Sequence, residues 1–154
     1  MEFFHGTTKL GAESIKNNGI DLSKNRPNLD FNSSNQGALY VSNSYDETVK
    51  YNARLEKMGK GSTDIVKFDV PDDQLADLKI KTFDSANDEW ADFVTKSRKG
   101  ELLHDYDMVI GPKLANPDEV LNGIKSPRAL KEMQVTLNSE KAAKLFSNFI
   151  TCNS

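Results

Sequence analysis

The residues of this chain with the greatest potential for chemistry lie in short segments that are far apart along the sequence. They are His5, Gly6, Thr7, Tyr40, Ser42, Tyr51, Glu132 and Gln134. Together they supply an imidazole, two phenols, two hydroxyls, an unhindered backbone, and a carboxylate or carboxamide. These are the groups needed to hold a nicotinamide ribose and break its glycosidic bond. The pattern therefore predicts NAD as a substrate.

Each of these groups has an expected task in that reaction. Cleavage of the nicotinamide–ribose bond passes through an oxocarbenium-like transition state, as glycoside hydrolysis does. Gly6 has no side chain, so its backbone can reach the nicotinamide amide. His5 can bond a ribose hydroxyl, while Tyr40 and Tyr51 can enclose the cationic ring. Acceptor character from residues 132–137 would support the developing cation.

The alternation of side chains in two expected strands supports this assignment. In residues 38–42, Tyr40 and Ser42 lie on one face and the apolar side chains on the other. In residues 132–137, Glu132 and Gln134 share a face opposite the apolar one. Alternation cannot show that the two polar faces meet in one site. The simpler alternative is that each polar face is exposed to solvent. Both Glu132 and Gln134 remain candidates for the catalytic position.

Short strands and small helices are expected to carry these residues. Strands are predicted at residues 2–5, 38–42, 64–70, 78–83, 106–110, 133–137 and 148–151, the fifth ending at Gly111-Pro112. Helices are predicted at residues 10–17, 44–57 and 140–146, and a further one capped by Ser85 or Asn87 is predicted to run to Arg98. Other helix starts are expected at Asn116-Pro117 and Ser126-Pro127. Residues 21–37 are predicted to form a long polar loop. Because evenly spaced crossover helices are missing, we expect a single α+β domain over residues 1–154.

The order of these segments resembles that of ADP-ribosyltransferases of the diphtheria-toxin and poly(ADP-ribose)-polymerase type, whose motif is His–Tyr–Glu. It is similar also to a smaller bacterial and phage-associated family of the same fold, long labelled a domain of unknown function. Residues 4–8 resemble the histidine element, and residues 38–42 resemble the strand of the motif tyrosine. Tyr51 matches the second stacking tyrosine. Residues 106–112 and 134–142 resemble later blocks of the smaller family.

The resemblance implies an ADP-ribosyltransferase fold, in which two small, mostly antiparallel sheets form an NAD cleft with short flanking helices. It implies transfer of one ADP-ribose from NAD to a macromolecular acceptor, protein or nucleic acid, by a monomeric, toxin-like protein. Two departures qualify this. Residues 32–36 lengthen the loop that precedes Gly37. Gln134 also falls where the family has its glutamate, and a neutral amide stabilises a cation less than a carboxylate does, so polymer synthesis is not expected.

Composition narrows the classes of function. The net charge of -3 provides no global positive field for a nucleic-acid backbone. No apolar run is long enough to cross a membrane, and we expect no secretory leader, because the sequence opens on strand-like residues. The single cysteine, Cys152, cannot form an internal disulfide. The chain has only two histidines, so the cluster at residues 104–107 lacks further metal ligands. We therefore expect a cytoplasmic protein without a metal.

Three other functions fit the same residues. Water as the acceptor would make the protein an NAD glycohydrolase. A catalytically silent module would bind a nucleotide or a protein on the same fold. An RNA 2′-phosphotransferase would need several basic residues in the cleft, which the sequence alone does not place. The basic run at residues 96–99 is expected to be a solvated surface, and Trp90, Phe93 and Val94 are expected to be core.

Overall fold

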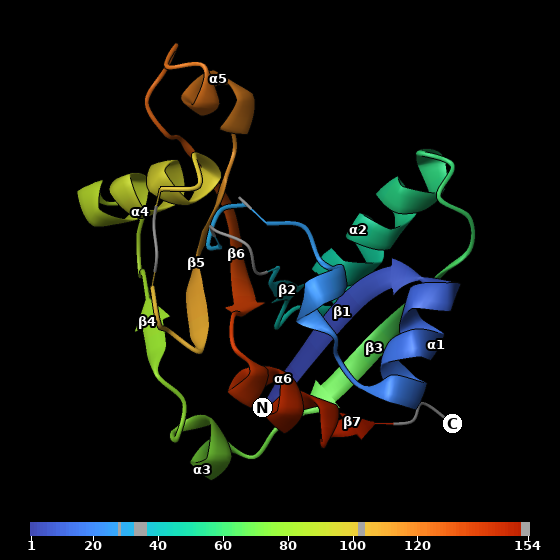
Figure 1. The fold of residues 1–154 in the computed structure, drawn as a ribbon. Helices are drawn as coiled ribbons and strands as arrows, with labels where there is room; N and C mark the ends of the chain where they lie inside the picture. Colours follow the sequence, from blue (N-terminus) through green and yellow to red (C-terminus); the bar gives the residue numbers. More distant parts are fainter. Residues whose placement is uncertain (28, 33–36, 102–103, 152–154) are drawn as a thin grey trace.

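The computed structural model describes residues 1–27, 29–32, 37–101 and 104–151. Cys152 and the inserted residues 33–36 lie outside this range. Two small sheets form the centre of the molecule (Figure 1). Within the described residues, no helix combines the length and the apolar character that crossing a membrane would require.

The first sheet has the order β1-β3-β7, and both of its pairs are antiparallel. Its strands are β1 (Glu2–Thr8), β3 (Thr63–Asp69) and β7 (Ile150–Thr151). The second sheet has the order β2-β6-β5-β4, with only the β4–β5 pair parallel. Its strands are β2 (Leu39–Val41), β4 (Ile80–Thr82), β5 (Met108–Leu114) and β6 (Ala129–Leu137). The predicted α+β class with two small, mostly antiparallel sheets is confirmed.

Short helices surround the two sheets. They are α1 (Lys9–Asn18), α2 (Tyr45–Lys57), α3 (Asp72–Leu75), α4 (Asp88–Arg98), α5 (Pro117–Leu121) and α6 (Glu140–Ser147). The predicted start of α2 is confirmed, because the Ser44 side chain accepts from the Glu47 N–H at 3.2 Å. The predicted end of α1 is also confirmed, since Gly19 follows the helix with a φ of 80°. Local sequence signals therefore fix several helix ends.

The apolar side chains form two cores. One lies between the sheets, α1 and α6, and contains Leu39, Val41, Val135 and Leu137. These residues are the predicted inward faces of β2 and β6. The second core lies under α4 and contains Trp90 and Val94 with Phe31, while Phe93 is only partly buried. The second sheet is therefore covered on both faces near its middle.

Strand β5 does not end at Gly111-Pro112, contrary to prediction, but continues to Leu114. Neighbouring polar contacts show why a proline fits there. The Ile110 carbonyl accepts from Phe83 and the Leu114 N–H donates to Asp30, so both point away from β6. By alternation the Pro112 nitrogen points the same way, where β4 has already ended at Thr82. Pro112 thus removes no ladder hydrogen bond.

One other prediction about local structure is wrong. Ser126-Pro127 does not begin a helix but leads directly into β6, which starts at Ala129. The described part of residues 21–37 is mostly irregular, as predicted, with a short 3₁₀ helix at Leu22–Lys24. Within it, Asp30, Phe31 and Asn32 are buried. This loop is therefore anchored to the rest of the fold by packing.

Candidate functional site

A pocket of about 430 Å³ opens at the junction of the two sheets. Its volume falls in the usual range of small-molecule sites. Six of the eight candidate residues line it: His5, Gly6, Tyr40, Ser42, Tyr51 and Gln134. Thr7 and Glu132 do not. Residues separated by more than a hundred positions in the sequence therefore meet in one cavity.

The pocket begins where β1 and β2 separate. Phe4 and Ser42 exchange two backbone hydrogen bonds, of 2.7 and 2.8 Å, in an isolated bridge. Backbone groups alternate in direction along a strand, so the N–H and C=O of Gly6 point to the same side as those of Phe4, away from β3. Within the described part of the chain, no backbone bond joins Gly6 to Tyr40 across this gap. The Gly6 backbone is left facing the pocket.

Helix α2 packs tightly against β1 at Gly6. A Cβ atom at this position would lie 2.3 Å from Oδ1 of Asn52 and 3.0 Å from Cγ2 of Thr48. No L side chain fits this spacing unless its neighbours move. The glycine therefore has two roles. It allows α2 to pack against β1, and it leaves its own backbone accessible from the pocket.

His5 fills the gap between the two strands. Its Nδ1 lies 2.7 Å from the Tyr40 carbonyl oxygen. A carbonyl oxygen can only accept, so in the neutral ring the proton sits on Nδ1 and Nε2 keeps its lone pair. Burial lowers the pKa of His5 below its usual value, and the bond to the Tyr40 carbonyl opposes this only in part. The pocket thus contains an imidazole whose Nε2 accepts from no described residue.

Tyr40 is held by its hydroxyl at the back of the pocket. That hydroxyl accepts from the Phe31 N–H and donates to Oδ1 of Asn32, both at 2.9 Å. Burial raises the pKa of the Tyr40 phenol far above its usual value. The phenol stays protonated, so Tyr40 contributes a fixed ring face and not a base.

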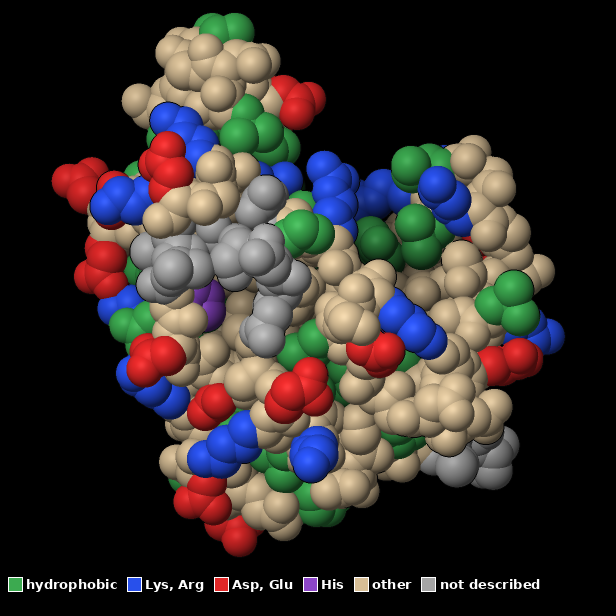
Figure 2. Space-filling view, in the orientation of Figure 1, with side chains coloured by type: hydrophobic (Ala, Val, Ile, Leu, Met, Phe, Trp, Pro, Cys, Tyr) green, Lys and Arg blue, Asp and Glu red, His purple; other side chains and the backbone are tan. Residues whose placement is uncertain are grey.

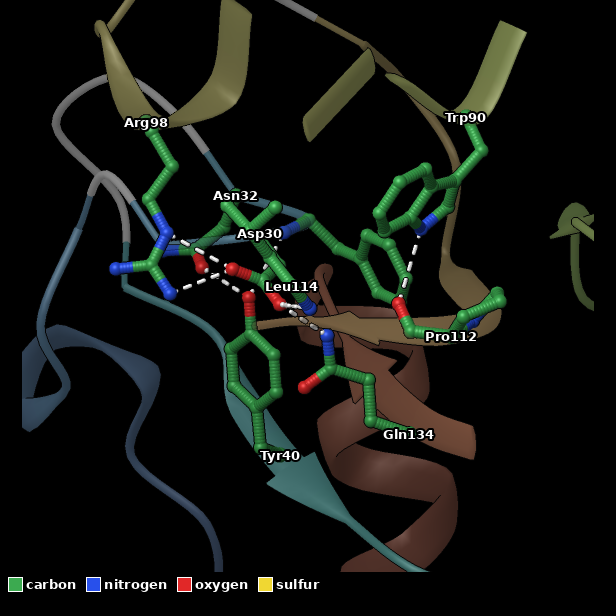
Figure 3. A network of polar contacts seen from close by, with 9 residues as sticks. Asp30, Asn32, Tyr40, Trp90, Arg98, Pro112, Leu114 and Gln134 are labelled. Atoms are coloured by element: carbon green, nitrogen blue, oxygen red, sulfur yellow. Dashed lines mark hydrogen bonds and ion pairs between the residues drawn. The ribbon is translucent and has the colours of Figure 1, made fainter. Parts of the chain in front are cut away.

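Behind Tyr40 lies a buried carboxylate, Asp30, which is 3% exposed. Arg98 of α4 donates to its Oδ1 from Nε at 2.8 Å and from Nη2 at 2.5 Å. The Leu114 N–H (2.8 Å) and Gln134 Nε2 (2.7 Å) donate to its Oδ2. Figure 3 shows this network joining four separate segments. Both carboxylate oxygens are thus committed to internal contacts.

Glu132 is separated from Gln134 by an irregularity in β6. Met133 pairs with Pro112, but the next pair is Leu114 with Ala129. Residues 130–132 of β6 therefore lie opposite Lys113 alone, and the simple alternation of faces is lost there. As a result Leu130 lines the pocket and Glu132 does not. The expectation that Glu132 and Gln134 share the site face is not met.

Helix α2 forms the opposite wall. Glu47, Tyr51 and Arg54 recur at helical spacing and line the pocket. Tyr51 is 43% exposed, and no hydrogen bond or ion pair joins these three side chains to any described residue. This wall presents a ring, a cation and a carboxylate that are all available to a ligand.

The mouth of the pocket is basic although the chain is acidic. Arg26, Arg54 and Lys113 line the pocket there, and Arg98, which is paired with Asp30, lines it farther in. In Figure 2, Lys and Arg side chains gather in the hollow between α2 and the part that carries α4 and α5. A ligand with phosphate groups would fit this charge. The basic residues that the sequence alone does not place in a cleft are brought together by the fold.

Sequence reasoning missed Asp30, Arg98, Glu47 and the basic mouth. Arg98 was expected on a solvated surface, yet its side chain is only 16% exposed. The Asp30-Phe31 pair was a usable signal, because an aromatic residue inside a polar loop indicates a buried anchor. His104 has a structural role, since its ring contacts the Phe31 carbonyl at 2.9 Å. No cluster of three potential metal ligands occurs among the described residues.

Comparison with known proteins places these residues in a recognised family. A family model described as "Protein of unknown function (DUF3990)" matches residues 1–136. The match includes every residue that lines the pocket. No similar sequence was found among curated proteins.

Proposed function

The chain belongs to the DUF3990 family, and from this premise we propose that it is an ADP-ribosyltransferase that uses NAD as a substrate. The observation that carries the proposal is the shared pocket of His5, Gly6, Tyr40, Tyr51 and Gln134. Each of these residues supplies a group that this one reaction needs. Their convergence supports that reaction.

The walls of the pocket fit the parts of NAD. The Gly6 N–H and C=O would bond the nicotinamide amide, and the rings of Tyr40 and Tyr51 would flank the pyridinium. Nε2 of His5 would accept from a ribose hydroxyl. Arg54, with the other cations of the mouth, would offset the charge of the diphosphate.

The reaction itself is a displacement at the ribose C1′ carbon. The bond from C1′ to the nicotinamide nitrogen breaks, and its electron pair leaves with neutral nicotinamide. The acceptor supplies the electron pair of the new bond and loses a proton. Glu47, a lining carboxylate without an ion-pair partner among the described residues, is available to take that proton. Gln134 places its amide beside the developing cation.

Adenylate-labelled NAD with a cell lysate tests this function. Wild-type protein should release nicotinamide and label a macromolecule, while Gln134→Ala should lower the rate about 100-fold, as loss of one transition-state contact does. Gln74→Ala is the matched control, because Gln74 is exposed on α3 and lies outside the pocket. Equal rates for the two variants would contradict the proposal.

Other outcomes identify the alternatives. Free ADP-ribose without labelled acceptor would indicate an NAD glycohydrolase. NAD binding without nicotinamide release would indicate a silent binding module. A 2′-phosphorylated RNA end should be assayed in parallel, because the basic mouth also fits a phosphate of that kind. The natural acceptor, protein or nucleic acid, would be identified from the labelled fraction.

A further inference from the structure

The hydrogen bond between Gln134 and Asp30 fixes which atom of the glutamine amide faces the carboxylate. Both oxygens of an ionised carboxylate can only accept hydrogen bonds. The amide nitrogen must therefore point toward Asp30, as the 2.7 Å contact from Nε2 to Oδ2 has it. Rotating the amide by half a turn would set two acceptors against each other in a buried place.

The carbonyl oxygen of Gln134 is consequently turned away from Asp30. In Figure 3 it points to the side of the Tyr40 ring, another residue that lines the pocket. It has no hydrogen-bond partner among the described residues, and it is not one of their fully buried unpaired atoms. The amide thus turns its acceptor oxygen toward the pocket side.

Asp30 is built to hold this orientation. Arg98 donates twice to Oδ1, which leaves Oδ2 for Leu114 and Gln134. The guanidinium is the cation paired with the carboxylate, and the backbone N–H of Leu114 donates to its other oxygen. A charged acceptor also polarises the amide that donates to it, which increases the negative character of the amide oxygen.

We propose that Asp30 is a positioning residue, which orients Gln134 so that its carbonyl oxygen faces the ribose of the substrate. The carboxamide then does part of the work of a carboxylate, since an oxygen with partial negative charge lies where positive charge develops. This inference rests on the NAD-cleaving function proposed above. It assigns the buried carboxylate, 104 positions away in sequence, a role in catalysis that it exerts only through Gln134.

The first test is the pH dependence of kcat in Gln134→Glu and in the double variant Asp30→Asn/Gln134→Glu. In the single variant, the introduced carboxyl would lie beside Asp30, and a neighbouring like charge raises its pKa. The rate of nicotinamide release should therefore rise with pH at a high midpoint as that carboxyl ionises. The double variant lacks the like charge, so its midpoint should fall by about one pH unit or more. Coincident midpoints would overturn the inference, and Gln74→Glu is the matched control.

The second test is Asp30→Asn alone, measured on folded protein. If Asp30 positions Gln134, kcat should fall about 10-fold while KM for NAD changes little, because the misoriented amide affects mainly the charged transition state. If Asp30 serves only stability, the melting temperature should fall with kcat per folded molecule unchanged. That result would overturn the inference.

A third measurement needs no NAD and separates the two proposals. In ¹⁵N-labelled protein, an amide proton of Gln134 bonded to a carboxylate should resonate downfield of those of exposed Gln74, and Asp30→Asn should remove the difference. Its absence from the wild-type spectrum would overturn the positioning role. Its presence in a protein that releases no nicotinamide would overturn the proposed function and leave the orientation intact.

Discussion

The wall of the pocket around Asp30 is closed by internal contacts, whereas the wall formed by α2 is open. At the first, Asp30, Arg98, Tyr40 and Gln134 bond one another or nearby backbone. At the second, the side chains of Glu47, Tyr51 and Arg54 have no hydrogen-bond or ion-pair partner among the described residues. The difference indicates that the first wall is assembled on folding and the second is completed by a ligand.

The two walls should therefore respond differently to substitution. Changes at the Asp30 wall remove contacts that the folded chain makes with itself, so they should lower the free energy of unfolding. Changes at the α2 wall remove groups that only a bound molecule would contact, so they should weaken ligand binding with little effect on folding. Four predictions examine this contrast.

The largest effect is expected for Arg98→Met. It leaves the Asp30 carboxylate buried without its cation, and the free energy of unfolding should fall by about 3–5 kcal/mol. Lys96→Met is the matched control on the same helix, because Lys96 forms an exposed pair with Asp92 at 3.0 Å. Such surface pairs contribute about 0.2–1 kcal/mol. Denaturant unfolding measures both, and equal losses would show that the Asp30 wall is not a buried network.

Gly6→Ala should have the next largest effect, because the new methyl group would overlap Oδ1 of Asn52. Overpacking of this kind costs about 1–3 kcal/mol. Asn52→Ala removes the overlapping atom, so Gly6→Ala should cost less in that background. The four proteins form a double-mutant cycle for denaturant unfolding. An unchanged cost would mean that α2 is not seated by this close approach.

Tyr51→Ala tests the open wall. If the ring stacks on a ligand, affinity for NAD in titration calorimetry should fall about 5-fold, since aromatic and cation–π contacts are worth about 1 kcal/mol. Stability should change by less than about 0.5 kcal/mol, as for other surface positions. Val49→Ala is the control, because Val49 lies on the same helix, is also 43% exposed and does not line the pocket. Similar affinities for both variants would argue against stacking.

The smallest effect is expected at His5, where the two walls meet. Its pKa is lower in the folded chain than the usual value of 6.5 because the ring is buried. The unfolded chain therefore binds the proton more readily, and stability should be lost as the pH falls below 6.5. His5→Asn keeps a donor for the Tyr40 carbonyl but does not titrate, so its stability should depend less on pH between 7 and 5. Parallel wild-type and variant curves would show that His5 is not held neutral by burial.

The predictable parts of the site come from signals that act over a few residues. Alternation along the strands correctly placed Leu39, Val41, Val135 and Leu137 in the core. It also predicted that Tyr40 points away from that core, toward the pocket. The capping serine Ser44 fixes where α2 begins, and the helical repeat from that point determines which face of α2 carries Tyr51. That face lines the pocket. Wherever strand and helix geometry were regular, the residues on one face could be read from their spacing.

The unpredictable parts depend on breaks in that regularity. Glu132 looked equivalent to Gln134 because both have the same parity, but residues 130–132 bulge against Lys113 and cancel it. Proline lacks an N–H, so Pro112 was predicted to end a strand. The missing N–H is harmful only where a neighbouring strand would accept from it, and β4 has already ended at this position. Such cases depend on where the adjacent strand stops, which no short window of sequence contains.

The sequence by itself determined the class of fold, the polar and apolar faces of β2 and most helix ends, because propensity, capping and alternation are local properties. Tertiary structure alone decided that Asp30 and Arg98, 68 positions apart, form the buried pair behind the pocket. Burial creates the requirement for that pairing, since a desolvated carboxylate must find a cation and hydrogen-bond donors. The same requirement turns the Gln134 amide, so the chemistry offered to a ligand was settled by packing.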